Sequence, residues 1–161
     1  KTPLKEGQSV MVDLGGNFNG YMGDMSRVFS IGKLPEEAYA AHQVCLDIQE
    51  KIASIARPGV SCEQLYDTAI QIATEAGFRD KFMGTNQQAK FIGHGIGLEI
   101  NEAPVLAPRM KQELEPDMVF ALEPKIVLPG VGPVGIENSW VVTNEGIEKL
   151  TNCREEIIEL S

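Results

Sequence analysis

Two stretches of this sequence carry acidic side chains inside apolar, strand-like runs, and this repeated pattern limits the fold more than any other feature. In the first stretch, an apolar run ends around Asp13, and a glycine-rich segment leads to a second run that contains Asp24. In the second stretch, an apolar run ends on Glu123, and another glycine-rich loop leads to a run that contains Glu137. Such a repeat predicts two β-hairpins related by an approximate twofold axis. That symmetry would place the four carboxylates around one centre.

The strand boundaries follow from alternating apolar residues and turn residues. Residues 10–14 and 21–29 predict the arms of the first hairpin, with residues 15–20 as the turn because they are rich in Gly and Asn. Residues 118–123 and 134–143 predict the arms of the second hairpin. A short closing strand is expected at residues 147–150, and a turn at residues 101–104.

The sequence between the hairpins has helical periodicity. Residues 35–56 place an apolar side chain every three or four positions, with Pro35 suited to a first helical turn. Ser61 followed by Gln64 is typical of a capping box, which predicts a second helix up to Gly77. No confident structure follows for residues 78–90. Strands mixed with two helices predict an α+β fold.

Acidic residues inside apolar strands need an explanation, because a buried carboxylate without a partner is costly. Taken singly, each of the four is better explained as facing solvent on the polar side of a sheet. Taken jointly with the glycine-flanked His94, they fit a dinuclear metal site better. Carboxylate oxygens with one imidazole suit Mn²⁺, Fe²⁺, Co²⁺ or Zn²⁺. Two such ions about 3.5–4 Å apart are used for hydrolysis.

The histidines have a simpler alternative reading. His94 stands between glycines, which allow the tight bend that would aim it at a metal or a proton, but a turn with a surface histidine has the same sequence. His42 lies beside the apolar stripe of the first predicted helix, where packing is a better explanation than metal ligation.

Composition excludes some classes of partner. The net charge of −9 and pI of about 4.7 argue against a nucleic-acid or anionic-membrane surface. No apolar run approaches the roughly 18 residues that span a bilayer, so no membrane contact is expected. The three cysteines are scattered and odd in number, which favours a reducing cytoplasm.

Five motifs then show a family resemblance that runs in order across nearly the whole chain. The motifs are Val12-Asp13-Leu14-Gly15-Gly16, Gly23-Asp24-Met25-Ser26-Arg27, Gly93-His94-Gly95-Ile96-Gly97-Leu98-Glu99, Ala121-Leu122-Glu123-Pro124 and Gly135-Ile136-Glu137-Asn138. They resemble the catalytic half of the Xaa-Pro dipeptidases and aminopeptidases P, M24 metallopeptidases related to methionine aminopeptidase. The resemblance implies the pita-bread fold, an antiparallel sheet with helices packed on one face.

The resemblance also implies roles for these residues. Asp13 would bind one metal ion, Asp24 and Glu137 would bridge two ions, and His94 and Glu123 would bind the other. Glu123 and His94 would be the catalytic residues, with Glu123 exchanging protons with a metal-activated water. Two divalent ions are expected, manganese first and cobalt, zinc or iron as alternatives. The substrates would be short peptides cleaved at an Xaa-Pro bond by a cytoplasmic homodimer.

Three departures from the family pattern bear on activity. The family has a substantial stretch before the Asp13 strand, so residues 1–161 are expected to be a partial catalytic domain that lacks its N-terminal portion. Asn101 stands where the family has a substrate-binding histidine, and an amide carries neither the proton nor the charge of an imidazole. Gly135 stands where the family has an arginine, so a guanidinium contact is expected to be lost. We therefore expect weak or altered activity.

Two other functions remain open. One is a creatinase-like hydrolase, which shares the fold but uses no metal; the intact acidic ligands argue against it. The other is a binding module that has kept the fold and lost turnover, which Asn101 and Gly135 favour. Metal binding would separate the peptidase from the first alternative, and turnover of Xaa-Pro peptides would separate it from the second.

Overall fold

The computed structural model describes residues 3–160, so residues 1, 2 and 161 of the predicted domain lie outside the described residues. The described chain forms two helices and ten strands. The helices, α1 and α2, follow the first hairpin. The elements are β1 Ser9–Phe18, β2 Tyr21–Ile31, α1 Glu36–Ile55, α2 Cys62–Glu75, β3 Gly93–Gly95, β4 Glu102–Leu106, β5 Val119–Leu122, β6 Lys125–Leu128, β7 Gly132–Gly135, β8 Asn138–Val142, β9 Ile147–Lys149 and β10 Ile158–Leu160.

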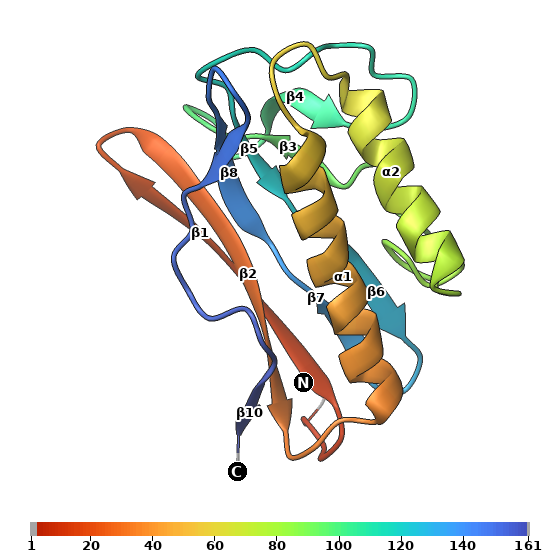
Figure 1. Ribbon diagram of the computed structural model, residues 1–161. Helices are drawn as coiled ribbons and strands as arrows, with labels where there is room; N and C mark the ends of the chain where they lie inside the picture. Colours follow the sequence, from red (N-terminus) through yellow and green to blue (C-terminus); the bar gives the residue numbers. More distant parts are fainter. Residues whose placement is uncertain (1–2, 161) are drawn as a thin grey trace.

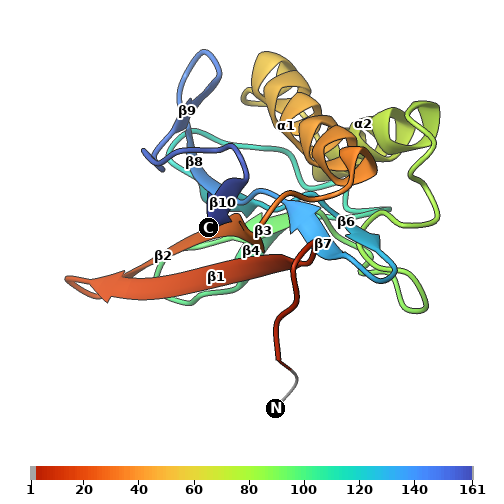
Figure 2. The ribbon, with the colours of Figure 1, turned by 90° about the horizontal axis from the view of Figure 1, so that it is seen from below.

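The strands form three sheets, and both helices cover the same side of them. The sheet orders are β1-β2-β10, β4-β3-β5-β8-β9 and β6-β7. In Figure 1 the two helices run side by side in front of the strands, and Figure 2 shows both on one face. The predicted α+β class with helices on one face of antiparallel sheets is confirmed. One strand pair is not antiparallel: β10 pairs with β2 in parallel after a long connection.

The first predicted hairpin is confirmed, with a tighter turn than expected. Asn19 and Gly20 have φ angles of 51° and 88°, which a two-residue hairpin turn needs. Residues 15–18, predicted as turn, continue strand β1 instead. Gly15 pairs with Asp24 and Gly16 with Gly23. Because two residues suffice to reverse the chain, the other turn-favouring residues pair across the ladder.

The second hairpin differs in detail from the prediction. The predicted strand 134–143 is divided into β7 and β8 around Ile136 and Glu137. At this break Ile136 N–H donates to Pro124 O at 3.2 Å, and Glu137 N–H donates to Ser26 O at 3.4 Å. Pro124 interrupts the facing arm between β5 and β6, since it has no N–H for the ladder. The break turns Glu137 toward β2, which belongs to the first hairpin.

The predicted turn at residues 101–104 is wrong from Glu102 onward, because β4 begins there. Strand β4 is at the edge of its sheet, where Pro104 removes no ladder donor that the sheet needs. Its partner β3 carries His94 and pairs with β5 on the other side. The short strand that carries the histidine is therefore held from both sides.

The helices follow the prediction closely. Ser61 accepts a hydrogen bond from the Gln64 N–H at 3.3 Å and caps α2. The apolar stripe of α1 packs onto the sheets, and its fully buried members are Ala38, Ala41, Cys45, Ile48 and Ile52. His42 is buried, with Nε2 2.7 Å from Glu155 O, so its role is packing, as expected. Across residues 3–160, neither helix combines the length and apolar character of a membrane span.

Candidate metal centre

Three of the predicted metal-binding residues meet where the two hairpins and β3 come together. Asp24 comes from β2, His94 from β3, and Glu137 from the break between β7 and β8. One ligand atom from each lies within 4.8 Å of the others. His94 and Glu137 are only 6% and 2% exposed. These three side chains can therefore contact a single ion from different directions.

The glycines on both sides of His94 do not form the predicted bend; they allow close approach of the neighbouring strands. His94 lies in a strand, and a Cβ atom at Gly93 would lie 2.3 Å from Ala121 O. A Cβ at Gly95 would lie 2.2 Å from Ala103 O. Glycine is needed because both neighbouring strands approach this closely. The close fit holds the histidine backbone between β4 and β5.

The orientation of the His94 ring leaves one nitrogen free. Nδ1 lies 3.1 Å from the carbonyl oxygen of Gly95, to which it can donate its proton. Nε2 then has its lone pair free, and it faces Asp24 Oδ2 at 3.9 Å and Glu123 Oε1 at 3.7 Å. Metal-binding histidines commonly use one ring nitrogen while the other is fixed by a hydrogen bond.

Glu123 and Asp13 complete the set of predicted ligands. Glu123 follows β5, and its N–H donates to Ile92 O at 2.8 Å, which fixes its backbone beside β3. Asp13 is exposed on β1, opposite Ser26 in the ladder. Its charge and a hydrogen bond to Asp24 both act on the Asp24 carboxyl. Glu123 therefore lies beside the three residues, and Asp13 acts on Asp24 from an exposed position.

The carboxylates of the cluster are not fully stabilised in their charged forms, as the raised pKa values of two of them show. Burial raises the pKa of Glu137 to about 7; the hydrogen bond from Ser26 opposes this shift, and the neighbouring carboxylates add to it. Burial and the charge of Asp13 also raise the pKa of Asp24. A divalent cation would remove both the repulsion and the unfavourable burial of charge. Oxygen donors with one imidazole fit Mn²⁺, Fe²⁺, Co²⁺ or Zn²⁺.

Known proteins are similar to this chain over most of its length. Residues 1–144 match metallopeptidase family M24. The chain belongs to family M24. The M24 chain is 31% identical over 155 residues to the Xaa-Pro dipeptidase of Pyrococcus furiosus, covering 96% of this chain and 43% of the relative. It is 34% identical over 156 residues to the probable dipeptidase PepE of Mycobacterium tuberculosis, covering 96% and 40%. The M24 chain thus spans about two fifths of the length of these curated relatives.

Solved structures show the same fold. The X-Pro aminopeptidase of Thermotoga maritima superposes with a TM-score of 0.88 and 32% identity, over 97% of the M24 chain and 43% of that structure. A prolidase from Pyrococcus furiosus superposes with a TM-score of 0.84 and 31% identity, over 93% and 43%. The predicted pita-bread fold is confirmed by these neighbours.

Lys125 is a functional candidate that the sequence analysis missed. Its ammonium Nζ lies 2.5 Å from Glu123 Oε2. Burial lowers the pKa of Lys125, but the charge and hydrogen bond of Glu123 outweigh it, so the pKa lies above its usual value. Lys125 stands two residues after Glu123, and side chains two residues apart on a continuous strand share a face. Because Pro124 interrupts the strand between them, this rule could not be applied from the sequence.

Gly135 has no room for the arginine that the resemblance led us to expect there. Gly135 pairs with Lys125 in the β6–β7 ladder, and a Cβ atom at Gly135 would lie 2.4 Å from Pro124 O and 2.8 Å from Lys125 Cβ. The expected guanidinium group is absent at position 135, but another positively charged side chain lies nearby. The facing strand of the M24 chain supplies an ammonium instead.

Gln49 of α1 also escaped the sequence analysis, although a polar residue inside an apolar helix stripe was a usable signal. Its Nε2 donates to Leu122 O at 2.7 Å and to Ile136 O at 3.2 Å. These carbonyls belong to the residues immediately before Glu123 and Glu137. Its Oε1 accepts from Asn138 Nδ2 at 2.8 Å. One buried amide thus ties together the two segments that carry the glutamates.

Asn101 lies beside the cluster, at an open hollow. The hollow has a volume of about 170 Å³ and is lined by Phe91, His94, Asn101, Glu102 and Val105. Asn101 is exposed, so its amide is free to turn toward a molecule that enters beside His94. The predicted substrate residue therefore has access to the space next to the histidine.

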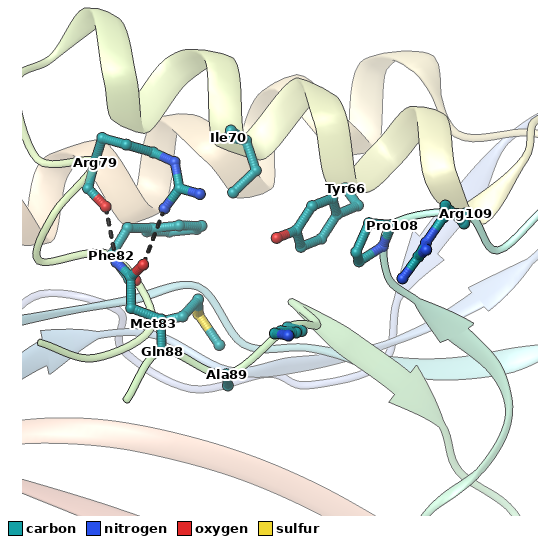
Figure 3. Close-up of a pocket in the computed structure, with 10 residues that line it drawn as sticks. Tyr66, Ile70, Arg79, Phe82, Met83, Gln88, Ala89, Pro108 and Arg109 are labelled. Atoms are coloured by element: carbon teal, nitrogen blue, oxygen red, sulfur yellow. Dashed lines mark hydrogen bonds between the residues drawn. The ribbon is translucent and has the colours of Figure 1, made fainter. Parts of the chain in front are cut away.

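A separate cavity of about 440 Å³ lies under α2, and no predicted site residue lines it. Figure 3 shows the Tyr66 hydroxyl directed into it, while Arg79 turns back to bond Gln88. The two arginines at its ends, Arg79 and Arg109, lie far apart in this view. None of the predicted site residues therefore faces this cavity.

Proposed function

We propose that this protein is a metal-dependent hydrolase that cleaves Xaa-Pro bonds in short peptides, as a proline dipeptidase or an aminopeptidase P, and that this chain is its partial catalytic domain. The observation that carries the proposal is the convergence of Asp24, His94 and Glu137, with ligand atoms within 4.8 Å of one another. The names of the relatives support the substrate class, since they are an Xaa-Pro dipeptidase and an X-Pro aminopeptidase.

We further propose that two divalent ions bind here, with manganese as the first candidate and cobalt, zinc or iron as alternatives. Asp24 and Glu137 would be shared between the ions, Asp13 would bind one, and His94 and Glu123 the other. When bound, such ions lower the pKa of a water molecule and polarise a peptide carbonyl. The buried acids support this proposal, because their raised pKa values reflect charge that a cation would neutralise.

The side chains of the site can perform the remaining tasks of hydrolysis. Glu123 can hold and release a proton at Oε1, the atom that faces His94. Asn101 can donate a hydrogen bond to a substrate oxygen in the adjoining hollow, but cannot supply a proton. Phe91 and Val105 give that hollow an apolar wall, which suits a proline ring. Substrate would thus be held beside the cluster.

Two proposals concern the state of the protein in the cell. The exposed apolar side chains of the first hairpin support a homodimer, because Leu14, Phe18 and Tyr21 are 54%, 80% and 64% exposed. A cytoplasmic location is supported by the cysteines, since Cys45, Cys62 and Cys153 are all free.

The decisive experiment compares Asp24→Asn with the wild type in the complete protein. Mn²⁺ binding is measured by titration calorimetry, and hydrolysis is measured with Xaa-Pro dipeptides and longer Xaa-Pro peptides. Asp67→Asn is the matched control, because Asp67 is exposed on α2. Asp24→Asn should lose ions and activity together, and the control should keep both. Two ions retained in Asp24→Asn would contradict the bridging role.

A second candidate function is a binding module on the same fold without turnover. It is favoured by Asn101, which lacks the imidazole of the family pattern, and by Lys125, which already occupies one oxygen of Glu123. Such a module would bind ions and Xaa-Pro peptides without hydrolysing them. Peptide binding measured by calorimetry, without product over hours, would decide for this candidate.

A further inference from the structure

The cavity under α2 has the size and the apolar surface of a small-molecule site. Its volume of about 440 Å³ lies within the range of about 300–1,000 Å³ that is usual for ligand pockets. The apolar part of its wall is formed by Ile70, Phe82, Met83, Ala89 and Pro108. Such a wall favours a ligand with an apolar body, because binding removes that body from water.

The charged side chains of the wall are all positive. Arg79, Lys90 and Arg109 line the cavity, and within residues 3–160 no aspartate or glutamate does. None of these three side chains forms an ion pair with another described residue. Acidic residues outnumber basic ones by 23 to 14 in this chain, so three such cations around one cavity are a local reversal of charge. The cavity is therefore complementary to an anion.

The polar groups of the wall still have hydrogen bonds to offer. Figure 3 shows the Tyr66 hydroxyl directed into the cavity, with Arg79 and Arg109 at its two ends. Nη1 of Arg79 donates to Gln88 Oε1 at 3.3 Å, which leaves the other N–H groups of the guanidinium available. Gln88 is itself held in place, because its Nε2 donates to the carbonyl oxygens of Arg79 and Phe82, both at 2.9 Å. The wall is thus built by its own hydrogen bonds and can donate to a carboxylate or a phosphate.

Two residues of the wall have strained backbones. Met83 and Arg109 have φ angles of 58° and 64°, and they are two of the four non-glycine residues with positive φ in the described chain. Arg109 follows Pro108 in a turn that Met110 N–H closes by donating to Ala107 O at 3.3 Å. Glycine or asparagine is favoured at this position of such a turn. An exposed arginine that is kept there against the turn chemistry points to a function of its side chain.

We propose that this cavity binds a small organic anion, a carboxylate or a phosphate ester that has an apolar body and no ammonium group. The arginines and Lys90 attract the anionic group, and the apolar wall takes the body. An ammonium group would lie among like charges with no carboxylate of the wall to pair with it. Amino acids and peptides are therefore poor ligands. The inference goes beyond the proposed hydrolysis and does not depend on it, since no residue of the metal centre lines the cavity.

The test uses ligands that differ in one group at a time. Titration calorimetry on the complete protein measures binding of 3-phenylpropionate and of phenyl phosphate, each at up to millimolar concentration. Phenylalanine has the same carbon skeleton as 3-phenylpropionate with an added ammonium group. Inorganic phosphate is the anion of phenyl phosphate without the apolar body. Comparison within these two pairs measures the effect of the ammonium group and of the apolar body.

Three variants locate the binding at this cavity. Arg79→Gln removes one cation, and Arg109→Gly removes another while supplying the residue that the turn favours. Arg57→Gln is the matched control, because Arg57 is exposed and does not line the cavity. All three remove one positive charge, so a general effect of net charge would be the same in each. Hydrolysis of Xaa-Pro peptides and the melting temperature are measured alongside.

The wild type and Arg57→Gln should bind 3-phenylpropionate or phenyl phosphate at least about tenfold more tightly than phenylalanine. The tighter of the two anions identifies the ligand as a carboxylate or as a phosphate ester. Arg79→Gln and Arg109→Gly should each weaken this binding about tenfold and leave hydrolysis unchanged. Arg109→Gly should do so without lowering the melting temperature, which a merely structural role of Arg109 would not produce.

Four results would overturn the inference. They are no binding of either anion, equal binding of phenylalanine and 3-phenylpropionate, equal binding of inorganic phosphate and phenyl phosphate, and wild-type affinity in both cavity variants. If a cavity variant fails to fold, Tyr66→Phe takes its place, because it removes only the hydroxyl that is directed into the cavity. The selectivity of the wild type among the four ligands decides without any variant.

Discussion

Nε2 of His94 lies 3.7 Å from Oε1 of Glu123, although the two residues belong to different segments of the chain. The β3–β5 ladder sets this distance, because His94 pairs with Ala121 and Glu123 follows two residues later. Side chains two residues apart on a strand share a face. The ladder register therefore brings an imidazole and a carboxylate to the same side of the sheet.

The first prediction concerns this histidine. His94→Ala should weaken Mn²⁺ binding by roughly 100-fold, because it removes a ligand that glycine-flanked backbone holds in place. His42→Gln is the control, since His42 is buried against Glu155 O and lies outside the cluster. Titration calorimetry measures both variants. Equal losses in the two variants would mean that destabilisation, not ligation, explains the effect.

The second prediction concerns Gln49. Gln49→Leu should lower the free energy of unfolding by about 1–3 kcal/mol, because the carbonyls of Leu122 and Ile136 lose their buried donor. It should also weaken metal binding, since those residues precede Glu123 and Glu137. Gln43→Leu is the matched control on the exposed face of α1. Urea unfolding and Mn²⁺ titration check the prediction, which fails if Gln49→Leu and Gln43→Leu behave alike.

The third prediction concerns the pH dependence of the metal-free protein. Because the pKa of Glu137 is raised to about 7 in the folded chain, folding favours its protonated form. This contribution is fully present below the unfolded pKa of about 4.5 and is lost as pH rises through 7. Its size is about 3 kcal/mol. With chelator present, the melting temperature should therefore fall between pH 5 and pH 8.

Two controls accompany that measurement. Glu137→Gln should flatten the pH profile, because the amide does not ionise. Saturating Mn²⁺ should stabilise the wild type most at high pH, where the carboxylate is charged. A metal-free wild type whose melting temperature rises steadily from pH 5 to pH 8 would contradict the buried-carboxyl account.

The fourth prediction concerns turnover. Asn101→His should raise kcat/KM for Xaa-Pro dipeptides by about tenfold or more, because an imidazole in the hollow beside His94 can carry a proton and a charge. Asn144→His is the control, as Asn144 is exposed in a turn. Steady-state kinetics in the complete protein give the answer. No gain in the variant would show that Asn101 does not limit hydrolysis.

Local signals in the sequence were enough for the main elements and for the set of acidic residues. The helical stripe from Ala38 to Ile52, the Ser61 cap and a turn within residues 15–20 depend on neighbours within a few residues, so periodicity and turn chemistry predict them. Strands β3 and β4 were not predicted, because the same kind of local signal was misleading there. The glycines around His94 and Pro104 favour turns locally, and only the adjacent strands show why they stand in a sheet.

The relations between distant segments were decided by the tertiary structure. Ser26 donates to Glu137 Oε2 at 2.6 Å, and a backbone bridge joins the same two residues, so the hairpins meet there. Lys125 reaches Glu123 because Pro124 breaks the strand and Gly135 leaves space. The candidate cation ligands were identified from the sequence alone. Packing between elements decided their distances, their pKa shifts and the ammonium among them, since burial and facing charges exist only in the folded chain.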